Sequence, residues 1–579
     1  MKQIDIRELI TSKYPDFLKG SPAFLRDLSF YTMKKLLRLR DVNAFLSQSQ
    51  GKTGIDFIDE IFEYLDFSYI LSAKDRDKIR SEGRVVIISN HPLGGLDGLA
   101  LIKLVSEIRP DVKVVVNDFL LNIDELKQFF LPYDLTTPKA QSKNVRAIID
   151  YLNHDHAVII FPAGVVSRFG LKGIRDGKWN KGFLFFAKAT NSPILPLYIE
   201  GRNTVLFYLV ALFSSLLSML MLPRELFKKK RSSIKISIGN SIPPSSFLNS
   251  IKDDKTTLKL LRKHLIRIAK NKPGIFKTEK NIIHPVGKKE LKKQILQSDV
   301  LGETSDGKLI VLLDGESAPD VMREIGRLRE LTFRKVGEGT GKRIDLDYFD
   351  KIYRQIVLWD DTELEIAGAY RIGECSRIYP EHRLYGIYSS SLFTFSEELT
   401  GNLHASLELG RSFVNAKYWN SHALDYLWQG IGSYLAVNPQ IKYLFGPVSI
   451  SNAYPQAAKE LLVYFFRKYF SPAESKVIAK SPFFISPPRE KELAELFNTG
   501  NYRSDFLTLK NQLKILGFSI PVLLKQYTEL CEPGGVTIFD FNIDPDFENC
   551  IDGLIYVEVD KLKEQKRARY IKSSYTKAV

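Results

Sequence analysis

The sequence predicts an α/β protein with two domains, and three observations indicate it. Between residue 84 and about residue 245, short β-branched runs alternate with helix-like segments, which is typical of an α/β domain around a buried sheet. A second series of such runs begins near residue 300. The chain has 579 residues, of which 44% are hydrophobic, enough to fill the cores of more than one domain.

The expected segments follow this order along the chain. Residues 1–80 form a helical N-terminal region, because the apolar residues of GIDFIDEIFEYLDF recur at helical spacing. Residues 81–285 form the first α/β domain, with strand candidates RVVIISN, VKVVVN, HAVIIFP, ILPLYIEG and IKISIGN. Residues 286–305 are charged and weakly periodic, and we expect a connector there. Residues 306–579 form the second domain, with strand candidates KLIVLL, QIVLWD, IAGAYRIG, LYGIYSSSLFTF and KYLFGPVSI.

Charge and cysteine content limit the classes of function. The net charge of +16 implies an acidic partner, such as nucleic acid, an anionic lipid or an acidic carrier protein. Aromatic and basic residues do not interleave as in the common nucleic-acid-binding domains, so we expect no nucleic-acid partner. The three cysteines form no cluster with zinc spacing, so we expect no structural metal and a reducing compartment. The first ten residues contain acids and do not resemble a signal peptide.

Residues 205–222 form an apolar run of 18 residues without a formal charge, close to the roughly 20 that a membrane span needs. The run lies between two strand candidates of one predicted sheet, and a single crossing would put those strands on opposite sides of the bilayer. A thin, less apolar stripe recurs at helical spacing, formed by Thr204, Tyr208, Ala211, Ser215 and Ser218. Five basic residues follow in RELFKKKR, suited to anionic headgroups. We expect a monotopic or re-entrant helix in one leaflet; a buried core helix is the alternative.

The segment SNHPLGGLDG follows the first strand candidate of the α/β domain. His91 comes just past the strand end, where α/β sheets place their chemistry, and Asn90 helps to stop the strand. Gly94 and Gly95 allow a ligand to approach the backbone closely. An imidazole held by the carboxylate of Asp97 can take a proton from a hydroxyl, and no Ser or Cys lies beside the pair as a nucleophile. The alternative is that Asp97 only caps the following helix.

Three blocks in this order, SNHPLGGLDG, FPAGVVSR and ILPLYIEG, resemble the successive blocks of the lysophospholipid acyltransferase family. That family moves acyl chains from acyl carrier protein or coenzyme A onto lysolipid hydroxyls. The resemblance covers roughly residues 80–245 and implies His91 as general base with Asp97 as its orienting partner. It also implies that the second block binds the acceptor, through Phe161, Pro162, Gly164 and Arg168.

Two departures from the family pattern bear on the acceptor. Five residues separate His91 from Asp97, where the family usually has four. In the second block, Ala163 and Val166 stand where the family usually has a glutamate and an arginine. A phosphate dianion is best held by a fork of guanidinium donors, so the sequence favours an acceptor other than lysophosphatidic acid. This variant of the second block resembles the corresponding block of those family members that act on amino-acid lipids. A lysophosphatidic acid acyltransferase with an accessory domain is the alternative.

In the C-terminal half, charged residues stand in or beside strand-like apolar runs. They are Arg329 followed by Phe333; Asp345, Asp347 and Asp350; Arg371; and Glu408 followed by Arg411. Buried charges are costly unless they are paired, so we expect Glu408 to pair with Arg411 and Arg371 to pair with an aspartate. Structural ion pairs are the alternative to a substrate site.

These spacings resemble the acyl-homoserine-lactone synthases. SLELGRSFV, YLFGPVSIS and SIPVLLKQYTEL resemble more closely the N-acyltransferases that make lyso-ornithine lipid, over roughly residues 310–560. Those enzymes have a fold like the GCN5-type acetyltransferases and transfer a 3-hydroxyacyl chain from acyl carrier protein to an α-amine. The resemblance implies that Glu408 holds the α-ammonium and helps it lose its proton. The implied substrate-binding residues are Arg329, Phe333, Asp347, Asp350, Arg371 and Arg411.

The donor and the acceptor of this second site are also implied. The segment RKVGEGTG holds no aromatic residue where the synthases have a tryptophan, which favours a simple amino acid over adenosylmethionine. No Gly-rich loop of the kind that binds coenzyme A is evident, which fits a carrier-protein donor. We expect no cofactor and no metal, only acyl-acyl carrier protein or acyl-CoA as donor substrate.

The whole chain resembles the bifunctional ornithine lipid synthases. The C-terminal domain would N-acylate an amino acid, ornithine first, with a 3-hydroxyacyl chain, and the N-terminal domain would esterify that 3-hydroxyl. The expected partners are acyl carrier protein, the amino acid and lyso-lipid substrates, and an anionic membrane surface at the cytoplasmic face of the inner membrane. The alternatives are glycine or serine lipid synthesis by the same steps, and a catalytically silent basic protein that only binds membranes.

Overall fold

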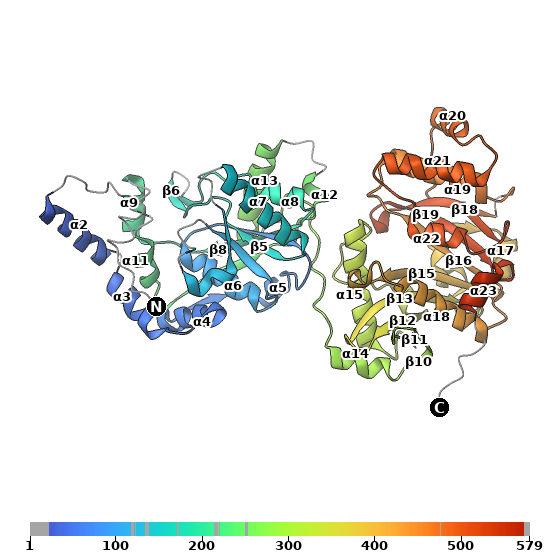
Figure 1. Cartoon of the computed structure of the whole chain (residues 1–579), viewed down its shortest axis with the longest axis horizontal. Coiled ribbons are helices and arrows are strands. Elements are labelled where there is room, and N and C mark those ends of the chain that lie inside the picture. Colours follow the sequence, from blue (N-terminus) through green and yellow to red (C-terminus); the bar gives the residue numbers. More distant parts are fainter. Residues whose placement is uncertain are drawn as a thin grey trace. The chain divides into compact units, whose positions relative to one another are not determined.

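The computed structural model describes residues 22–36, 38–116, 121, 123–133, 138–170, 173–213, 218, 221–248, 253–474 and 476–571. The chain divides into two compact units, Met1–Asn281 and Ile282–Val579 (Figure 1). Each unit combines helices with one large sheet, so the predicted α/β class is confirmed. Residues 286–305, expected as a connector, contain helix α14 and strand β10 of the second unit.

The first unit is built around a seven-stranded sheet with the order β1-β9-β8-β2-β5-β3-β4. Its strands are β1 (Phe67–Ile70), β2 (Val85–Ser89), β3 (Val112–Val116), β4 (Phe130–Pro132), β5 (Ala157–Ile160), β8 (Ile194–Glu200) and β9 (Ser232–Ile238). All neighbours are parallel except the antiparallel pair β8 and β9. The five strand candidates of this domain are thus confirmed, and a separate hairpin joins β6 (Arg168–Gly170) to β7 (Gly173–Arg175).

Helices cover both faces of this sheet. They are α2 (Ala23–Leu36), α3 (Leu39–Gln48), α4 (Gly54–Leu65), α5 (Ala73–Arg76), α6 (Gly95–Ser106), η2 (Asp124–Phe129), α7 (Pro138–Asn153), α8 (Gly182–Ala189), α9 (Val205–Phe213), α11 (Leu222–Phe227), α12 (Ser245–Leu248) and α13 (Asp254–Ala269). Alternate residues of β2 serve the two faces: Val85 and Ile87 belong to the cluster of α4 and α6, whereas Val86 and Ile88 belong to that of α7, α8 and α13. The helical region expected at residues 1–80 also supplies β1, an edge strand of the sheet.

The second unit contains an eight-stranded sheet with the order β10-β11-β12-β13-β15-β16-β19-β18. Its strands are β10 (Asp299–Glu303), β11 (Leu309–Asp314), β12 (Arg354–Asp360), β13 (Glu365–Glu374), β15 (Ser406–Val414), β16 (Tyr443–Ile450), β18 (Val536–Asp544) and β19 (Cys550–Glu558). Only β15 and β16 are parallel. They pair from Ser406 with Tyr443 to Glu408 with Phe445, and no pairing continues beyond. The later halves of these two strands therefore face each other without ladder hydrogen bonds.

Helices and short turns surround this second sheet. They are α14 (Lys288–Ile295), α15 (Pro319–Val336), η3 (Tyr348–Lys351), α16 (Cys375–His382), η4 (Arg383–Gly386), η5 (Tyr388–Ser391), α17 (Glu397–Gly401), η6 (Asn402–Ala405), η7 (Ala416–Tyr418), α18 (Ala423–Val437), α19 (Gln456–Phe470), α20 (Pro487–Leu496), α21 (Tyr502–Ile515), α22 (Val522–Thr528), η8 (Pro545–Phe547), η9 (Val559–Lys561) and α23 (Glu564–Tyr570). The buried apolar residues of α15 and those of α18 belong to two different apolar clusters. The strand expected in LYGIYSSSLFTF is wrong for most of its length, because η4 and η5 precede a strand of three residues, β14 (Phe393–Phe395), which pairs with β17 (Val477–Ala479).

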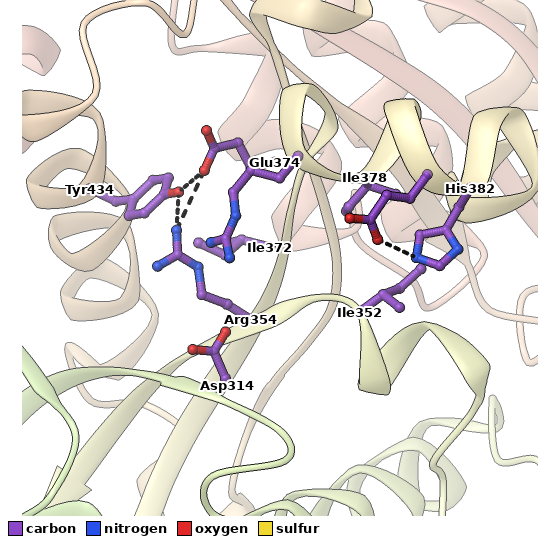
Figure 2. A pocket seen from close by; sticks show the side chains of 10 residues that line it. Asp314, Ile352, Arg354, Ile372, Glu374, Ile378, His382 and Tyr434 are labelled. Carbon is purple, nitrogen blue, oxygen red and sulfur yellow. Dashed lines mark hydrogen bonds and ion pairs between the residues drawn. The ribbon is translucent and has the colours of Figure 1, made fainter.

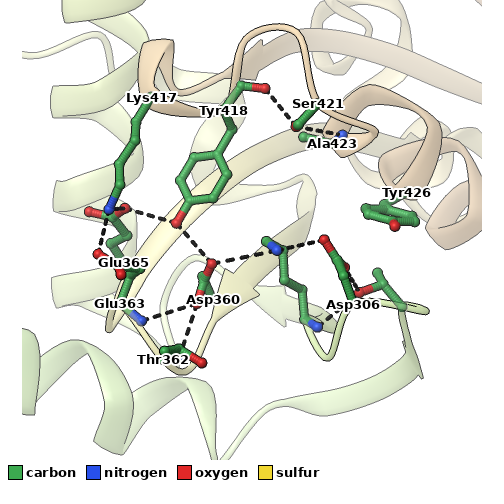
Figure 3. A network of polar contacts seen from close by, with 12 residues as sticks. Asp306, Asp360, Thr362, Glu363, Glu365, Lys417, Tyr418, Ser421, Ala423 and Tyr426 are labelled. Atoms are coloured by element: carbon green, nitrogen blue, oxygen red, sulfur yellow. Dashed lines mark hydrogen bonds and ion pairs between the residues drawn. The ribbon is translucent and has the colours of Figure 1, made fainter.

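A polar network ties together the loops before α18 (Figure 3). The Tyr418 hydroxyl donates to Asp360 at 3.0 Å and to Glu365 at 2.8 Å. Lys417 reaches Glu363 at 2.5 Å and Glu365 at 2.7 Å. These contacts join η7 to the turn between β12 and β13, so the start of α18 is held against the sheet from which the second site is built.

Candidate active sites

His91 and Asp97 meet at the end of β2. His91 Nδ1 lies 3.1 Å from Asp97 Oδ2, within ion-pair distance but not aligned as a hydrogen bond. The imidazole is 19% exposed, whereas the carboxylate is fully buried. The opposite ring nitrogen of His91 has no hydrogen bond with any described residue. The ring is therefore held on its Nδ1 side and open on its Nε2 side, the orientation that a general base needs.

Asp97 also caps helix α6. Its Oδ2 accepts the backbone N–H groups of Leu93 at 2.8 Å and Gly94 at 3.1 Å, just before the helix begins. Gly94 has a φ of 91°, a left-handed conformation that favours glycine, and a Cβ there would lie 3.0 Å from a Leu222 methyl. Burial raises the pKa of Asp97, opposed by His91 and by the two N–H groups. The capping role and the His91 contact thus belong to one carboxylate, so the two expectations for Asp97 are not exclusive.

The strand ends around His91 are fixed by polar contacts. The Asn90 side chain donates to the Ile199 carbonyl at 2.9 Å and accepts the Ile199 N–H at 2.8 Å, which locks the end of β2 to β8. The His91 ring stacks on Phe161 with centroids 4.1 Å apart. The backbone of Pro162 accepts the Asn180 N–H, and Gly164 turns the chain with a φ of 65°. Asn90, Phe161, Pro162 and Gly164 therefore lie in or beside the loops around His91, and their expected role in binding the substrate stays a prediction.

Asp176 is a residue of this site that sequence reasoning missed. Its Oδ1 accepts the His91 N–H at 3.2 Å and the Ser167 hydroxyl at 2.6 Å, and its Oδ2 accepts the Trp179 indole N–H at 3.1 Å. The Ser167 N–H in turn donates to the His91 carbonyl at 2.8 Å. Asp176 thus joins FPAGVVSR to the histidine loop. It lies 85 residues beyond His91, and only an acid within the polar stretch IRDGKW signals it in the sequence.

Two of the predicted acceptor-binding residues are exposed, whereas the two residues that depart from the family pattern lie among apolar side chains. Gly95 is exposed at the first turn of α6, and Arg168 is exposed in β6, where it pairs with Arg175 of β7. Ala163, by contrast, is buried in an apolar cluster, and Val166 packs against α9 and the residues after it. Both departures from the family pattern therefore place an apolar side chain in apolar surroundings.

Helix α9 exposes an apolar face. Tyr208, Ala211 and Ser218 are buried and Thr204 is half-buried, so the less apolar stripe faces the protein; Ser215 lies outside the described residues. The exposed residues of the helix are Val205, Leu206, Leu209, Leu212 and Phe213. Glu225 is buried and accepts both the N–H and the hydroxyl of Thr204 at 2.7 Å, which fixes the start of the helix. None of the described helices is long and apolar enough to cross a membrane.

The second site is a buried network of arginines and aspartates. Arg329 Nη1 lies 2.7 Å from Asp350 Oδ1, and Arg371 Nη1 lies 2.7 Å from Asp347 Oδ1 and 3.4 Å from Asp350 Oδ2. Asp347 and Asp350 also cap η3 reciprocally, which explains their spacing. Burial would raise the pKa of Asp350, but Arg329 and Arg371 hold that pKa well below its ordinary value. The expected pairing of Arg371 with an aspartate is confirmed.

Arg371 keeps donors that no described residue accepts. It is 1% exposed, yet its Nε and Nη2 have no hydrogen-bond partner among the described residues. Its guanidinium lies 5.3 to 5.7 Å from the ring centroids of Phe349, Tyr353 and Tyr388. Buried donors without acceptors are rare and costly, so they indicate a place that an anionic ligand would complete.

Arg411 lies at a β-bulge of β15. Gly410 and Phe413 face Arg371 and Ala369 of β13, so β15 carries one extra residue, and Arg411 has a φ of 49°. Its guanidinium lies 5.2 Å from the Tyr388 ring centroid and 4.7 Å from that of Phe547, which packs on Phe333. Arg411 pairs with Asp345 at 3.7 Å and Asp347 at 3.6 Å. The expected pair with Glu408 is wrong, because the bulge turns Arg411 toward the aspartates.

Glu408 is fully buried and holds a loop. Its Oε1 accepts the Ser389 N–H at 2.6 Å and the Ser389 hydroxyl at 2.5 Å. Its Oε2 accepts the Tyr388 N–H at 2.9 Å and the Tyr353 hydroxyl. A carboxylate has about four acceptor positions, so no oxygen of Glu408 faces an ammonium in this arrangement. The expected role of Glu408 in deprotonation stays a prediction. In the structure, Glu408 holds the η5 loop, and the Tyr388 ring of that loop lies against the guanidinium groups of Arg371 and Arg411.

A cavity of about 210 Å³ opens elsewhere in the second unit (Figure 2). Arg354 reaches the Tyr434 hydroxyl at 2.6 Å, and that hydroxyl donates to Glu374 at 2.7 Å. Ile372 lines the cavity, and its neighbour Arg371 points to the opposite face of the strand. None of the residues predicted for the second site lines this cavity.

Comparisons with known proteins match both parts of the chain. Residues 11–268 match the family described as Acyltransferase, and residues 328–429 match the Acetyltransferase (GNAT) domain. A glycine N(alpha)-acyltransferase of Bacteroides thetaiotaomicron is 33% identical over 306 residues, 50% of this chain and 90% of that protein. A lyso-glycine lipid O-acyltransferase of the same organism is 32% identical over 252 residues, 42% of this chain and 90% of that protein.

A solved structure also aligns. It is the CoA-dependent acyl-homoserine lactone synthase MesI, at 12% identity over 45% of this chain and 95% of that chain, with a TM-score of 0.22. At this TM-score the similarity carries no inference about the present chain.

Proposed function

We propose that this chain, which belongs to the family of the glycine N(alpha)-acyltransferases and the lyso-glycine lipid O-acyltransferases, joins two acyl chains to one amino acid in successive steps. The chain is an acyltransferase with an N-terminal acyltransferase domain and a C-terminal GNAT domain. The observation that carries the proposal is that one chain combines both kinds of acyltransferase. The product of an N-acylation with a 3-hydroxyacyl chain bears the hydroxyl that an O-acylation consumes, so the two activities form one sequence.

The first step would occur at the arginine site of the second unit. An amino acid presents an α-carboxylate, and the unpartnered Nε and Nη2 of Arg371 are donors suited to it. Arg411, beside Asp345 and Asp347, would hold the same end of the substrate from β15. The free amine then attacks the thioester carbonyl of the donor; the C–N bond forms, the C–S bond breaks and a thiol leaves. Acyl carrier protein is the proposed donor, with acyl-CoA as the alternative.

The second step would occur at His91. The 3-hydroxyl of the lyso-lipid gives its proton to His91 Nε2 as its oxygen attacks a second acyl thioester. Asp97 keeps the ring oriented and favours the imidazolium that forms. The ester C–O bond forms, the C–S bond breaks, and the imidazolium returns its proton to the leaving thiolate. Phe161, stacked on the ring, would limit the approach to the Nε2 side.

Glycine is the amino acid that we place first. Both relatives act on glycine or lyso-glycine lipid by their names, and each match spans 90% of the relative. Ornithine, which the sequence patterns favour, is the second candidate. Its side-chain ammonium would need an acidic partner in addition to the contacts that glycine needs. Asp552 acts electrostatically on Glu338, and Asp544 acts on Asp552, so this group of acids would supply such a partner. Serine would need only one further hydroxyl contact.

We further propose that the protein works on the surface of an anionic membrane, at the cytoplasmic face of an inner membrane. The exposed leucines and Phe213 of α9 would enter one leaflet. Lys228, Lys230 and Arg231, exposed just beyond α11, would meet anionic headgroups. The Phe169 side chain of β6, 58% exposed, lies on a strand that contacts α9. A lyso-lipid in that leaflet would then reach His91 without leaving the membrane.

The test is to express the chain in a host that lacks amino-acid lipids and to analyse the lipids by mass spectrometry. Growth with labelled glycine in one culture and labelled ornithine in another identifies the amino acid. We expect a doubly acylated lipid that carries the glycine label. A label from ornithine alone would replace glycine by the second candidate, and the absence of any acylated amino acid would refute the proposal.

A further inference from the structure

The segment after helix α15 places a carboxylate at the split between β15 and β16. Gly337 ends the helix with a φ of 80°, and the Glu338 N–H donates to the Phe333 carbonyl at 2.8 Å. The Ser451 hydroxyl donates to the Val336 carbonyl at 2.5 Å, which ties the helix end to the residue after β16. Glu338 is therefore held where β15 and β16 no longer pair.

The Glu338 carboxylate has no hydrogen bond or ion pair with any described residue, and the residue is only half-buried. Titratable groups of β15, of β19 and of the segment before α19 interact with it electrostatically. Asp552 of β19 and Arg411 of β15 act on it electrostatically, and it acts in turn on Tyr454, before α19, and on Cys550 of β19. Asp552 itself accepts the Ser449 hydroxyl of β16 at 2.6 Å. Glu338 thus lies within electrostatic reach of the same Arg411 that we assign to the amino acid.

N-acylation needs a proton acceptor, and the carboxylate expected for it is occupied. The α-amine of an amino acid binds as an ammonium, which must lose a proton before its lone pair attacks. Glu408 has all its acceptor positions filled by Tyr353, Tyr388 and Ser389. Among the other acids near Arg411, Asp345 and Asp347 pair with arginines, and Asp544 accepts the Asp546 N–H at 2.9 Å. The Glu338 carboxylate has no such partner.

We propose that Glu338 takes the proton from the amino-acid ammonium in the N-acylation step, and that Asp552 is a positioning residue that acts through it. The inference rests on the proposed function, since it presumes an amine acceptor. One proton passes from nitrogen to Glu338, the freed lone pair forms the C–N bond, the C–S bond breaks, and the second proton of nitrogen passes to the leaving thiolate. Glu338 then releases its proton to water.

The ionisation of Glu338 suits this task. The partial burial of Glu338 and then the Asp552 charge raise the pKa of Glu338 to about 7, against the lowering effect of Arg411. Burial likewise raises the pKa of Asp552 to about 6, and Asp544 contributes. A base is most effective when its pKa lies near the working pH.

The experiment measures N-acylation of glycine by the full chain from pH 5 to pH 10, with 3-hydroxyacyl-acyl carrier protein as donor. The rate of the wild-type protein should fall as the pH drops through about 7, because Glu338 becomes protonated. Glu338→Gln should lower kcat on the order of 100-fold at pH 7 with a small change in the KM for glycine, and activity should return at high pH, where glycine is a free amine. Glu316→Gln, an exposed acid of the same unit, is the control and should leave the profile unchanged.

Asp552→Asn provides a second readout. Removal of its negative charge should lower the pKa of Glu338 and move the acid limb of the profile to lower pH, which a merely structural role would not do. If the Glu338→Gln protein is active and keeps the acid limb of the wild-type pH profile, the inference about Glu338 is wrong, whereas the proposed function stands. If Glu338→Gln does not fold, an unmoved limb in Asp552→Asn overturns it. A wild-type protein that N-acylates no amino acid would refute the proposed function, and the inference with it.

Discussion

The two candidate sites of this chain handle charge in opposite ways. At the first site, the His91 imidazole contacts the buried Asp97 carboxylate through Nδ1 and keeps Nε2 open, and the exposed apolar face of α9 belongs to the same unit. At the second, three arginines and three aspartates, buried or half-buried, pair with one another, and each of the three arginines keeps at least one donor without a partner among the described residues. The first arrangement suits a neutral hydroxyl carried by a lipid. The second suits a small, doubly charged acceptor that comes from water.

The difference also separates chemistry from stability. The His91 ring contacts Phe161 and Asp97, and Asp97 keeps two backbone N–H donors without it, so removal of the ring should affect the reaction more than the stability. The arginine–aspartate network is both a binding site and a part of the core, and loss of one member leaves a buried charge without a partner. The following predictions use this contrast, from the largest expected effect to the smallest.

His91→Ala should lower O-acylation on the order of 100- to 10,000-fold, the range in which a general base contributes. N-acylation should continue, so the mono-acylated amino acid accumulates, as followed by mass spectrometry of the lipids. His154→Ala is the matched control, because His154 is exposed at the end of α7. Normal amounts of the doubly acylated lipid from His91→Ala would mean that the first site is misassigned.

Asp350→Ala should destabilise the second unit by about 3–5 kcal/mol, since it leaves Arg329 and Arg371 without their shared partner. Urea unfolding measures this as an earlier transition of that unit. Because the pKa of Asp350 lies below its ordinary value, its stabilising contribution is present above the ordinary aspartate pKa and is lost as the pH falls through the folded-state value. The gap between variant and wild type should therefore narrow in acid. Asp314→Ala, which replaces an exposed aspartate, is the control and should leave the urea transition unchanged.

Leu209→Glu combined with Phe213→Glu should weaken binding to anionic vesicles by about 10-fold or more. The two side chains are 50% and 89% exposed, and burial of an apolar side chain contributes about 1.5–3 kcal/mol. Co-sedimentation with vesicles measures the loss, and O-acylation of a vesicle-bound lyso-lipid should slow with it. Leu507→Glu, 58% exposed in the second unit, is the control. Equal losses from both proteins would place the membrane contact elsewhere.

Asp176→Asn should have the smallest effect, a fall of a few-fold in O-acylation. The amide keeps one acceptor oxygen for Ser167 and the His91 N–H, and a single neutral hydrogen bond contributes about 0.5–1.5 kcal/mol. Initial rates at saturating lyso-lipid measure it. A loss as large as that of His91→Ala would show that Asp176 takes part in the chemistry itself.

The sequence predicted those parts of the sites that depend on near neighbours. β2, the turn with Gly94 and the return of Asp97 to His91 follow from residues within one loop. The partners of Glu408 could not be found in this way. Its donors, Tyr353 and Ser389, lie 55 and 19 residues away, and the turn that carries Ser389 reads like a strand.

The same limit explains the other differences. Asp176 is brought to His91 by the hairpin of β6 and β7, which has no strong pattern of its own. The bulge at Arg411 redirects a side chain that strand periodicity would send elsewhere. Bulges and long-range loop contacts depend on tertiary packing, which local propensity does not encode.

The central claim is that one chain performs both transfers on the same molecule, and a complementation assay tests it most directly. Purified His91→Ala protein is incubated with labelled glycine and the acyl donors until the mono-acylated product accumulates. Arg371→Met protein, which keeps the first site and lacks the carboxylate donors of the second, is then added. We expect no doubly acylated lipid before the addition and its appearance afterwards at a rate near that of the wild type. Doubly acylated lipid from His91→Ala alone, or no conversion after Arg371→Met is added, would contradict the account.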